Sequence, residues 1–313
     1  MNRLIFFFLS AFYVLTSQGD VRVVFTPQWT AQAQFAGYYV ALQKGFFRQE
    51  GLDVVIEHPS ASSSSFSRVK KGRCQFSTCQ LMTAISHINE GVPLVNILQT
   101  SQRNTQVIVS HQPIRNLRSL KGKRVGNWTA GFSALGKIMD KEHHLGITWI
   151  PFVQNVSLFI SGAVDATMAQ SYNEYFQILA SGQPITKVNV LSMAEVGYDV
   201  PEDGLYVTAP YYRKHPDIVK RFRAAALRGW LYARTHPDET LHIVMKEMRI
   251  SGLHPNRLAQ KWMLKEIIKC MRDRKSGKVQ TLLRPKSVDF ANRLLFRYGY
   301  IKRQVTYQQI TKP

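Results

Sequence analysis

The stretch that decides the fold is residues 26–57, which reads TPQWTAQAQFAGYYVALQKGFFRQEGLDVVIE. A β-branched run at 21–25 precedes it and predicts a strand that ends at Pro27. Residues 32–44 are predicted to form a helix, because their apolar residues recur at helical spacing. A second β-branched run at 52–56 predicts another strand. Strand, helix and parallel strand in this order form the βαβ unit of an open α/β sheet.

The loop after the first predicted strand is a candidate binding site. In open α/β sheets, ligands bind outside the carboxyl ends of the strands, where loops and helix N-termini converge. Gln28 and Trp29 directly follow the strand at 21–25 and should lie at that edge. We expect an amide and a flat aromatic surface to contact a ligand there, together with Tyr38 from the following helix.

The segments PQW, QFAGYYVA, KGFF and EGLDV of this stretch resemble periplasmic substrate-binding proteins of ABC transporters, of the family related to the fungal thiamine-pyrimidine synthase. The resemblance is most specific here and continues more loosely to about residue 235. It implies an α/β fold of the type II periplasmic-binding-protein kind, with two lobes, a hinge of two crossover strands and a helical C-terminal region. It also implies a small-molecule ligand and, as partners, the permease subunits of an importer.

The length of the chain agrees with two lobes. At 313 residues it exceeds one ordinary α/β core and fits two lobes of about 100–150 residues each. We predict lobe 1 at 20–104 plus 205–313 and lobe 2 at 105–204, with crossings near 100–108 and 200–208. We expect the protein to be a monomer.

Residues 1–19 have the three parts of a secretory signal: a charged start, the apolar run LIFFFLSAFYVL and the small or polar TSQG. They predict a cleavable signal peptide and a periplasmic mature protein. A membrane anchor is the alternative, but twelve apolar residues are fewer than the roughly 20 that cross a bilayer.

The charge is concentrated in the last third of the chain. The net charge is +21, and residues 211–313 hold 24 Lys or Arg against 7 Asp or Glu. This region could contact an anionic surface, or its charges could be spread over solvated helix faces. We expect no nucleic-acid partner for an exported chain.

The three cysteines are predicted to be free thiols. Cys74 lies in a strand predicted at 73–77 and Cys79 at the start of a helix predicted at 79–89, which separates their Cα atoms too far for a disulfide. Cys270 stands alone on a predicted helix.

Two loops add candidate ligand contacts. Ser62 and Ser63 belong to a run of four serines before a helix, where hydroxyl and backbone N–H groups can bind a polar group, although one serine suffices as a helix cap. In lobe 2, GNWTAGF at 126–132 offers Asn127 as a polar contact, Trp128 as a flat one and Gly131 for close backbone approach. These three residues are therefore candidates as well.

A late strand of lobe 2 leads to Tyr172, Asn173 and Glu174, where the resembling family carries an aromatic-Asn-Glu cluster facing the cleft. Asn and Glu also suit a helix N-terminus. Glu195 in the return loop is a further candidate acceptor. The aromatic residues and carboxylates indicate a small flat heteroaromatic ligand, and the resemblance implies a pyrimidine precursor of thiamine.

The sequence raises three possible functions: a binding protein, an enzyme like the thiamine-pyrimidine synthase, and a sensor that presents its closed form to a membrane receptor. The enzyme uses pyridoxal phosphate, which requires a lysine and a nearby histidine. The matching positions hold Cys79 and Thr83, so we predict no catalytic residues and no cofactor. No metal site is expected either, because no Cys/His ligand spacing is present. The sequence does not separate transport from sensing.

Overall fold

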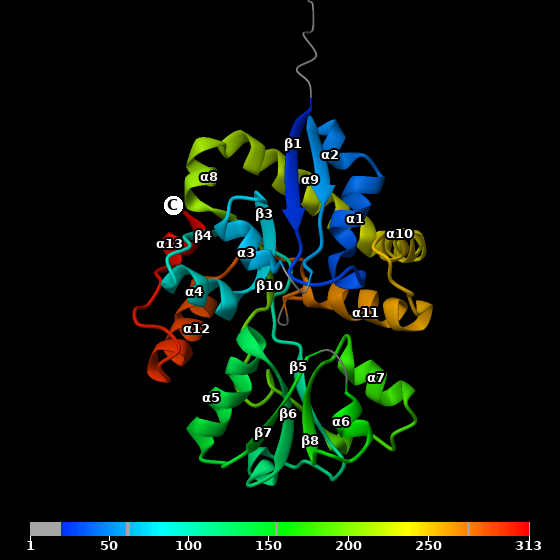
Figure 1. Ribbon diagram of the computed structural model, residues 1–313, viewed down its shortest axis with the longest axis vertical. Helices are drawn as coiled ribbons and strands as arrows, with labels where there is room; N and C mark the ends of the chain where they lie inside the picture. The colour runs from blue at the N-terminus through cyan, green and yellow to red at the C-terminus, as the bar shows by residue number, and fades with distance from the viewer. Residues whose placement is uncertain (1–19, 61–62, 154–155, 274–275, 313) are drawn as a thin grey trace, which may run out of the picture.

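The structure is a computed structural model that describes residues 20–312 except 61–62, 154–155 and 274–275. It contains two five-stranded sheets, one above the other in Figure 1. We call the parts of the chain around them lobe 1 and lobe 2. The predicted signal peptide, residues 1–19, lies outside the described residues. Within the described ranges, no helix combines the length and apolar character needed to cross a membrane.

The sheet of lobe 1 has the strand order β2-β1-β3-β10-β4. Its strands are β1 (Val21–Thr26), β2 (Leu52–Ile56), β3 (Phe76–Gln80), β4 (Leu94–Gln99) and β10 (Asp203–Thr208). β1 pairs in parallel with β2 and β3, whereas β10 is antiparallel to β3 and β4. The predicted βαβ unit is therefore present, and β10, which follows lobe 2 in the sequence, joins its sheet.

The sheet of lobe 2 has the order β7-β6-β8-β5-β9. Its strands are β5 (Gln106–Ser110), β6 (Arg124–Trp128), β7 (Thr148–Phe152), β8 (Ala166–Gln170) and β9 (Val190–Ser192). β6 is parallel to β7 and β8, so the carboxyl ends of β6 and β8 lie at one edge. Asn127 and Trp128 end β6, and the segments that follow β6 and β8 carry the other candidate residues of lobe 2 except Glu195.

The chain passes between the lobes twice, at 100–105 and 193–202. These connections form the hinge, and the predicted fold class is confirmed. The lobe limits at 104/105 and 204/205 remain a prediction; β10 already begins at Asp203.

Helices surround both sheets (Figure 1). The long C-terminal helices α9, α10 and α11 lie on the same side as α1, whereas α12 packs on α4. The bounds are α1 (Ala36–Gln43), α2 (Phe46–Gln49), α3 (Ser65–Lys70), α4 (Leu81–Asn89), α5 (Ala134–His143), α6 (Ser157–Ile160), α7 (Glu174–Ala180), α8 (Ala209–Lys214), α9 (Pro216–Thr235), α10 (Pro237–Ile250), α11 (Arg257–Cys270), α12 (Pro285–Arg297) and α13 (Tyr307–Thr311).

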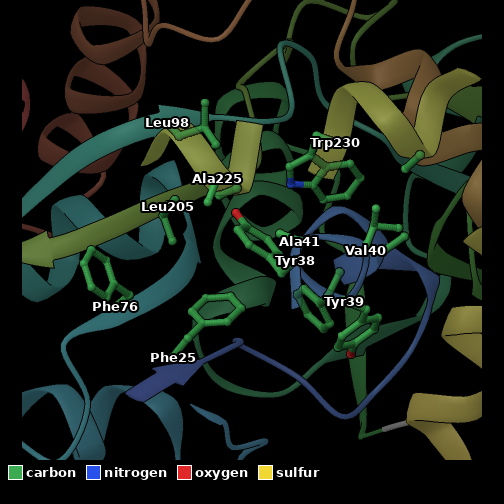
Figure 2. Close-up of a cluster of buried hydrophobic side chains, with 14 of the residues drawn as sticks. Phe25, Tyr38, Tyr39, Val40, Ala41, Phe76, Leu98, Leu205, Ala225 and Trp230 are labelled. Atoms are coloured by element: carbon green, nitrogen blue, oxygen red, sulfur yellow. The ribbon is translucent and has the colours of Figure 1, made fainter. Parts of the chain in front are cut away.

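An aromatic core fills the space between the sheet of lobe 1 and helices α1 and α9 (Figure 2). In this core, Tyr38 lies with its ring centroid 4.5 Å from that of Phe25 and 5.7 Å from that of Trp230. Glycines bring the two helices together. A Cβ added at Gly229 would lie 2.0 Å from the carbonyl oxygen of Gly37, so only glycine fits there.

The predicted limits of β3 and α4 are wrong. The sequence predicts a strand at 73–77 and a helix from 79, but the strand is Phe76–Gln80 and the helix starts at Leu81. Gly72 adopts φ +67°, and residues 73–75 lead the chain to the sheet, where the Gln75 amide donates to the carbonyl of Val24 at 3.0 Å. All three cysteines are unpaired, as predicted, and Cys74 and Cys270 are buried.

Candidate ligand-binding cleft

A cavity of about 470 Å³, counting its open mouth, is lined by residues of both lobes. Lobe 1 contributes the loop after β1 and the start of the next helical segment. Lobe 2 contributes the loops after β6, β7 and β8. The lining residues are Gln28, Trp29, Gln32, Gln34, Trp128, Phe132, Val153, Gln170, Tyr172, Asn173 and Glu174.

Hydrogen bonds fix the backbone of the loop that carries Trp29, at the carboxyl end of β1. The amide N–H of Gln28 donates to Thr78 Oγ1 at 2.9 Å, and Nδ1 of His58 lies 2.7 Å from the carbonyl oxygen of Trp29. The Trp29 ring meets Phe132 of lobe 2 edge-on, with centroids 6.0 Å apart and planes at 88°. The two lobes therefore touch through aromatic side chains beside the cavity.

Glu174 organises the lobe 2 side of the cleft. Its Oε1 accepts from Trp128 Nε1 and from Asn173 Nδ2, both at 3.2 Å, and its Oε2 accepts from the amide of Gln170 at 2.9 Å. Burial raises the pKa of Glu174, although these donors lower it. These donors fix the orientation of the carboxyl group, and Glu174 is part of the cavity lining.

Asp203 plays the matching role in lobe 1. It is buried at the start of β10, where Oδ1 accepts from Gln28 Nε2 at 2.8 Å and Oδ2 from Gln34 Nε2 at 2.7 Å. Burial raises the pKa of Asp203 to about 6, although the two amides lower it. The carboxylate is thus mostly ionised at neutral pH and aligns both glutamines. Oε1 of Gln28 is buried and, in the described part of the chain, has no partner.

The charge of the cleft differs from that of the whole chain. Glu174 is the one charged side chain among the described residues that line the cavity, and none of them is Lys or Arg. An anion bound here would be desolvated without a cation beside it, which is costly. The cavity therefore suits a neutral or cationic molecule, although the chain has a net charge of +21.

The structure brings six of the predicted site residues together around this cavity. They come from both lobes and from positions up to 146 residues apart: Gln28, Trp29, Trp128, Tyr172, Asn173 and Glu174. Tyr172 and Trp128 are buried, whereas Trp29 and Asn173 are partly exposed. These six residues form the candidate ligand-binding site.

Other predicted residues lie elsewhere. Tyr38 is buried in the lobe 1 core because its helix turns it away from the cleft toward Trp230. Asn127 is buried and donates to the carbonyl of Ser133 at 3.2 Å, which fixes the loop after β6. Glu195 lines a separate crevice behind the hinge. The site that we propose leaves these three residues out.

The remaining candidates are in two loops. Ser63 pairs with Ser60 through two backbone hydrogen bonds of 3.1 Å, and Ser64, which was not a candidate, caps α3. Ser62 lies outside the described residues. Gly131 belongs to the 3-10 helix Ala130–Ser133, and its neighbour Phe132 reaches the cavity.

Sequence reasoning missed several lining residues, namely Gln32, Gln34, Phe132, Val153 and Gln170, and also Asp203 behind them. One signal was available. Three glutamines, at 28, 32 and 34, follow β1 within eight residues, and amides clustered after a strand end indicate a polar ligand. Asp203 gave no such signal, because it reaches the site from β10, which follows lobe 2 in the sequence.

Two α/β lobes joined by two crossings, with an aromatic cavity between them, define the class of two-lobed periplasmic binding folds. A family model described as NMT1/THI5 like matches residues 32–240. The chain belongs to this family, and the predicted resemblance is confirmed.

Relatives in this family bind or make heteroaromatic molecules, by their names. The chain is 24% identical to riboflavin-binding protein RibY of Chloroflexus aurantiacus, over 72% of this chain and 66% of RibY, which is just under two thirds of its length. It is 24% identical to the formylaminopyrimidine-binding protein of Halalkalibacterium halodurans, over 69% and 68% of the two chains. It is 25% identical to the 4-amino-5-hydroxymethyl-2-methylpyrimidine phosphate synthase of Candida albicans, over 70% and 69%.

Solved structures share the fold. The periplasmic aliphatic sulphonate binding protein SsuA of Escherichia coli matches with a TM-score of 0.68 at 13% identity, over 94% of this chain and 97% of SsuA. The desulfurization enzyme DszB matches with a TM-score of 0.61 at 14% identity, over 94% and 96%. At these identities the likeness concerns the fold, which serves binding proteins and at least one enzyme.

Proposed function

We propose that this chain is an exported solute-binding protein that captures a small, flat aminopyrimidine in the cleft between its lobes and delivers it to an ABC importer. One observation carries the proposal. Trp29 and Trp128 approach one cavity from opposite lobes, with acceptor atoms of Gln28 and Glu174 beside them and no cation among the described lining residues.

The acceptors match the edge of an aminopyrimidine. An exocyclic amino group and a protonated ring nitrogen donate hydrogen bonds, and the ring face can stack on an indole. Gln28 Oε1 lacks a donor among the described residues, and Glu174 adds a carboxyl group to the lining. A ligand that donates a hydrogen bond to Gln28 Oε1 would satisfy this buried oxygen.

Size and charge narrow the choice among the ligands that relatives are named for. The enclosed part of the cavity is small, which favours a single ring over a three-ring flavin with its side chain. A sulphonate is disfavoured, because no Lys or Arg is found among the described lining residues. A pyrimidine without a phosphate fits both limits.

Binding rather than catalysis is supported by the residues that stand where the resembling enzyme has its lysine and histidine. Cys79 is a residue of β3 and Thr83 a residue of α4, and neither forms a Schiff base with pyridoxal phosphate. Export to the periplasm is part of the proposal and rests on the sequence of residues 1–19. The basic last third is free to contact an anionic surface, because none of the described residues that line the cleft is Lys or Arg.

A thermal-shift screen tests the proposal, because a ligand that binds only the folded state raises the melting temperature. The panel contains an aminopyrimidine, a formylaminopyrimidine, riboflavin, an alkanesulphonate and pyridoxal phosphate. We expect stabilisation by the pyrimidines. Stabilisation by the sulphonate alone, or an aldimine absorbance band with pyridoxal phosphate, would overturn the proposal.

A further inference from the structure

A second cavity adjoins the main one on the far side of Phe132, which lines both. It is much smaller than the main cavity and lies against the hinge. Gln80 ends β3, Gln106 begins β5 and Glu202 directly precedes β10, so three segments that meet where the chain crosses between the lobes form its wall.

Three buried polar atoms on this wall have no hydrogen-bond partner among the described residues. They are Gln80 Nε2, Gln106 Oε1 and Glu202 Oε1. Their side chains are deeply buried, since the three residues are 7%, 3% and 3% exposed. An unpaired buried polar group is destabilising, and few occur in a native fold. Three around one cavity indicate that a polar group fills it.

The second cavity is connected to the main one by hydrogen bonds. Thr105 Oγ1 contacts both Glu202 Oε2 and, at 2.5 Å, Gln170 Oε1. Gln170 lines the main cavity, and its backbone amide donates to Glu174. A group bound beside Glu202 is therefore next to the ring that we place between the tryptophans.

The side chains determine the charge of that group. Neither Lys, Arg nor His is found among the described residues of this wall, which disfavours an anion. A metal cation would leave the amide N–H groups of Gln80 unpaired, and no cluster of three metal ligands exists in the described chain. Burial raises the pKa of Glu202 to about 8, so its carboxyl is mostly protonated at neutral pH and both donates and accepts.

We infer that Gln80, Gln106 and Glu202 form a polar subsite of the cleft that receives a neutral hydroxyl or amino substituent of the bound ring. A glutamine amide presents either its oxygen or its nitrogen, so a group that donates and accepts satisfies all three side chains. The cavity has room for about one water-sized group, which fits these small substituents. This inference rests on the proposed function.

Calorimetric titration with three probes tests it. The first probe is 4-amino-5-hydroxymethyl-2-methylpyrimidine, the second has methyl in place of hydroxymethyl, and the third lacks the 4-amino group. The proteins are the full chain without residues 1–19, its Glu202→Gln and Gln80→Leu variants, and Gln49→Leu as a matched control at an exposed position of α2 outside both cavities. Melting curves of the free proteins show that each variant is folded.

We expect the parent protein to lose at least tenfold in affinity for one of the two truncated probes, because a buried subsite is then left unpaired. Glu202→Gln or Gln80→Leu should reduce that penalty to below threefold, and Gln49→Leu should keep it. If Gln80→Leu does not fold, Glu202→Gln, which preserves the side-chain shape, still tests whether the subsite causes the loss of affinity.

Two results overturn the inference. If the parent binds all three probes equally, or if the penalty persists in Glu202→Gln, the subsite holds only water and the proposed function stands. If the parent binds none of the three probes, the proposed function itself is wrong and the inference fails with it.

Discussion

Two tryptophans of lobe 1 show how the same residue type serves two purposes. Trp230 is 1% exposed and packs edge-on against Tyr38 in the core. Trp29 is partly exposed and contacts Phe132 of the other lobe across the cavity. Burial of the Trp230 ring stabilises the fold, whereas the partly exposed Trp29 ring can stack on a ligand.

We predict that Trp29→Ala weakens binding of the aminopyrimidine by about 1–3 kcal/mol, the typical loss of one stacking face, with little change in stability. Trp230→Ala is the matched control and should lower the free energy of unfolding by about 3–5 kcal/mol. Titration calorimetry and melting curves of both variants measure the two effects. Equal destabilisation by the two substitutions would place Trp29 in the core instead.

Removing the charge of Glu174 tests its double role. Glu174→Gln keeps the shape but replaces one acceptor oxygen with an amide donor, which opposes the donors of Trp128 and Gln170. We predict about 1–3 kcal/mol weaker binding. Fluorescence of Trp128 should also change in the ligand-free protein. An unaltered affinity in a folded variant would contradict the role that we give to this carboxylate.

The two adjacent hinge acids predict how stability depends on pH. Burial raises the pKa of Asp203 from 3.8 to about 6 and that of Glu202 from 4.5 to about 8. A carboxyl group whose pKa is higher in the folded than in the unfolded protein stabilises the fold. This stabilisation is complete below the pKa of the unfolded state and is lost as the pH rises through the pKa of the folded state. The free energy of unfolding should therefore fall between about pH 4 and pH 8, by up to about 1.4 kcal/mol for each pH unit and group.

Denaturant unfolding at several pH values measures this slope, and Glu202→Gln should flatten its upper part, from about pH 6 to pH 8. Asp217→Asn, at an exposed acid whose pKa is lowered by Arg221, is the control and should leave that part unchanged. A slope that survives in Glu202→Gln would mean that other groups cause it.

At the scale of elements, strands and helices with clear periodicity could be predicted from the sequence. The predicted limits of β2, at 52–56, agree with the observed ones, because a β-branched run that follows a glycine has a distinct pattern. β3 was displaced by three residues. Its sequence, FSTCQ, lacks a strong pattern, and its place depends on pairing with β1 and β10.

Helix α9 depends on Gly229 for its contact with α1. Because an added Cβ would lie 2.0 Å from a carbonyl oxygen, the helices must separate to accept it. We predict that Gly229→Ala lowers the free energy of unfolding by about 1–3 kcal/mol, at the upper end of this range. Lys220→Ala, on the exposed side of the same helix, should change it by less than about 0.5 kcal/mol. Similar melting temperatures for the two variants would refute the tight contact.

At the scale of the whole molecule, the site could be predicted only in part. Residues at a strand end or shortly after it, such as Trp128 and Trp29, could be found because strand ends are visible in the sequence. Asp203 and Phe132 could not, since their place at the cleft results from the return of the chain to the first sheet and from the closing of one lobe on the other. The absence of Tyr38 from the cleft could not be predicted either, because packing against Phe25 and Trp230 sets the rotation of its helix.

The central claim is that a neutral heteroaromatic ring binds between the two lobes. The measurement that tests it most directly is calorimetric titration of the protein with 4-amino-5-hydroxymethyl-2-methylpyrimidine and, separately, with its phosphate ester. We predict one site for the neutral ring and at least about tenfold weaker binding of the phosphate, because no Lys or Arg is found among the described lining residues. Equal or tighter binding of the phosphate, or no binding of the neutral ring, would contradict the account.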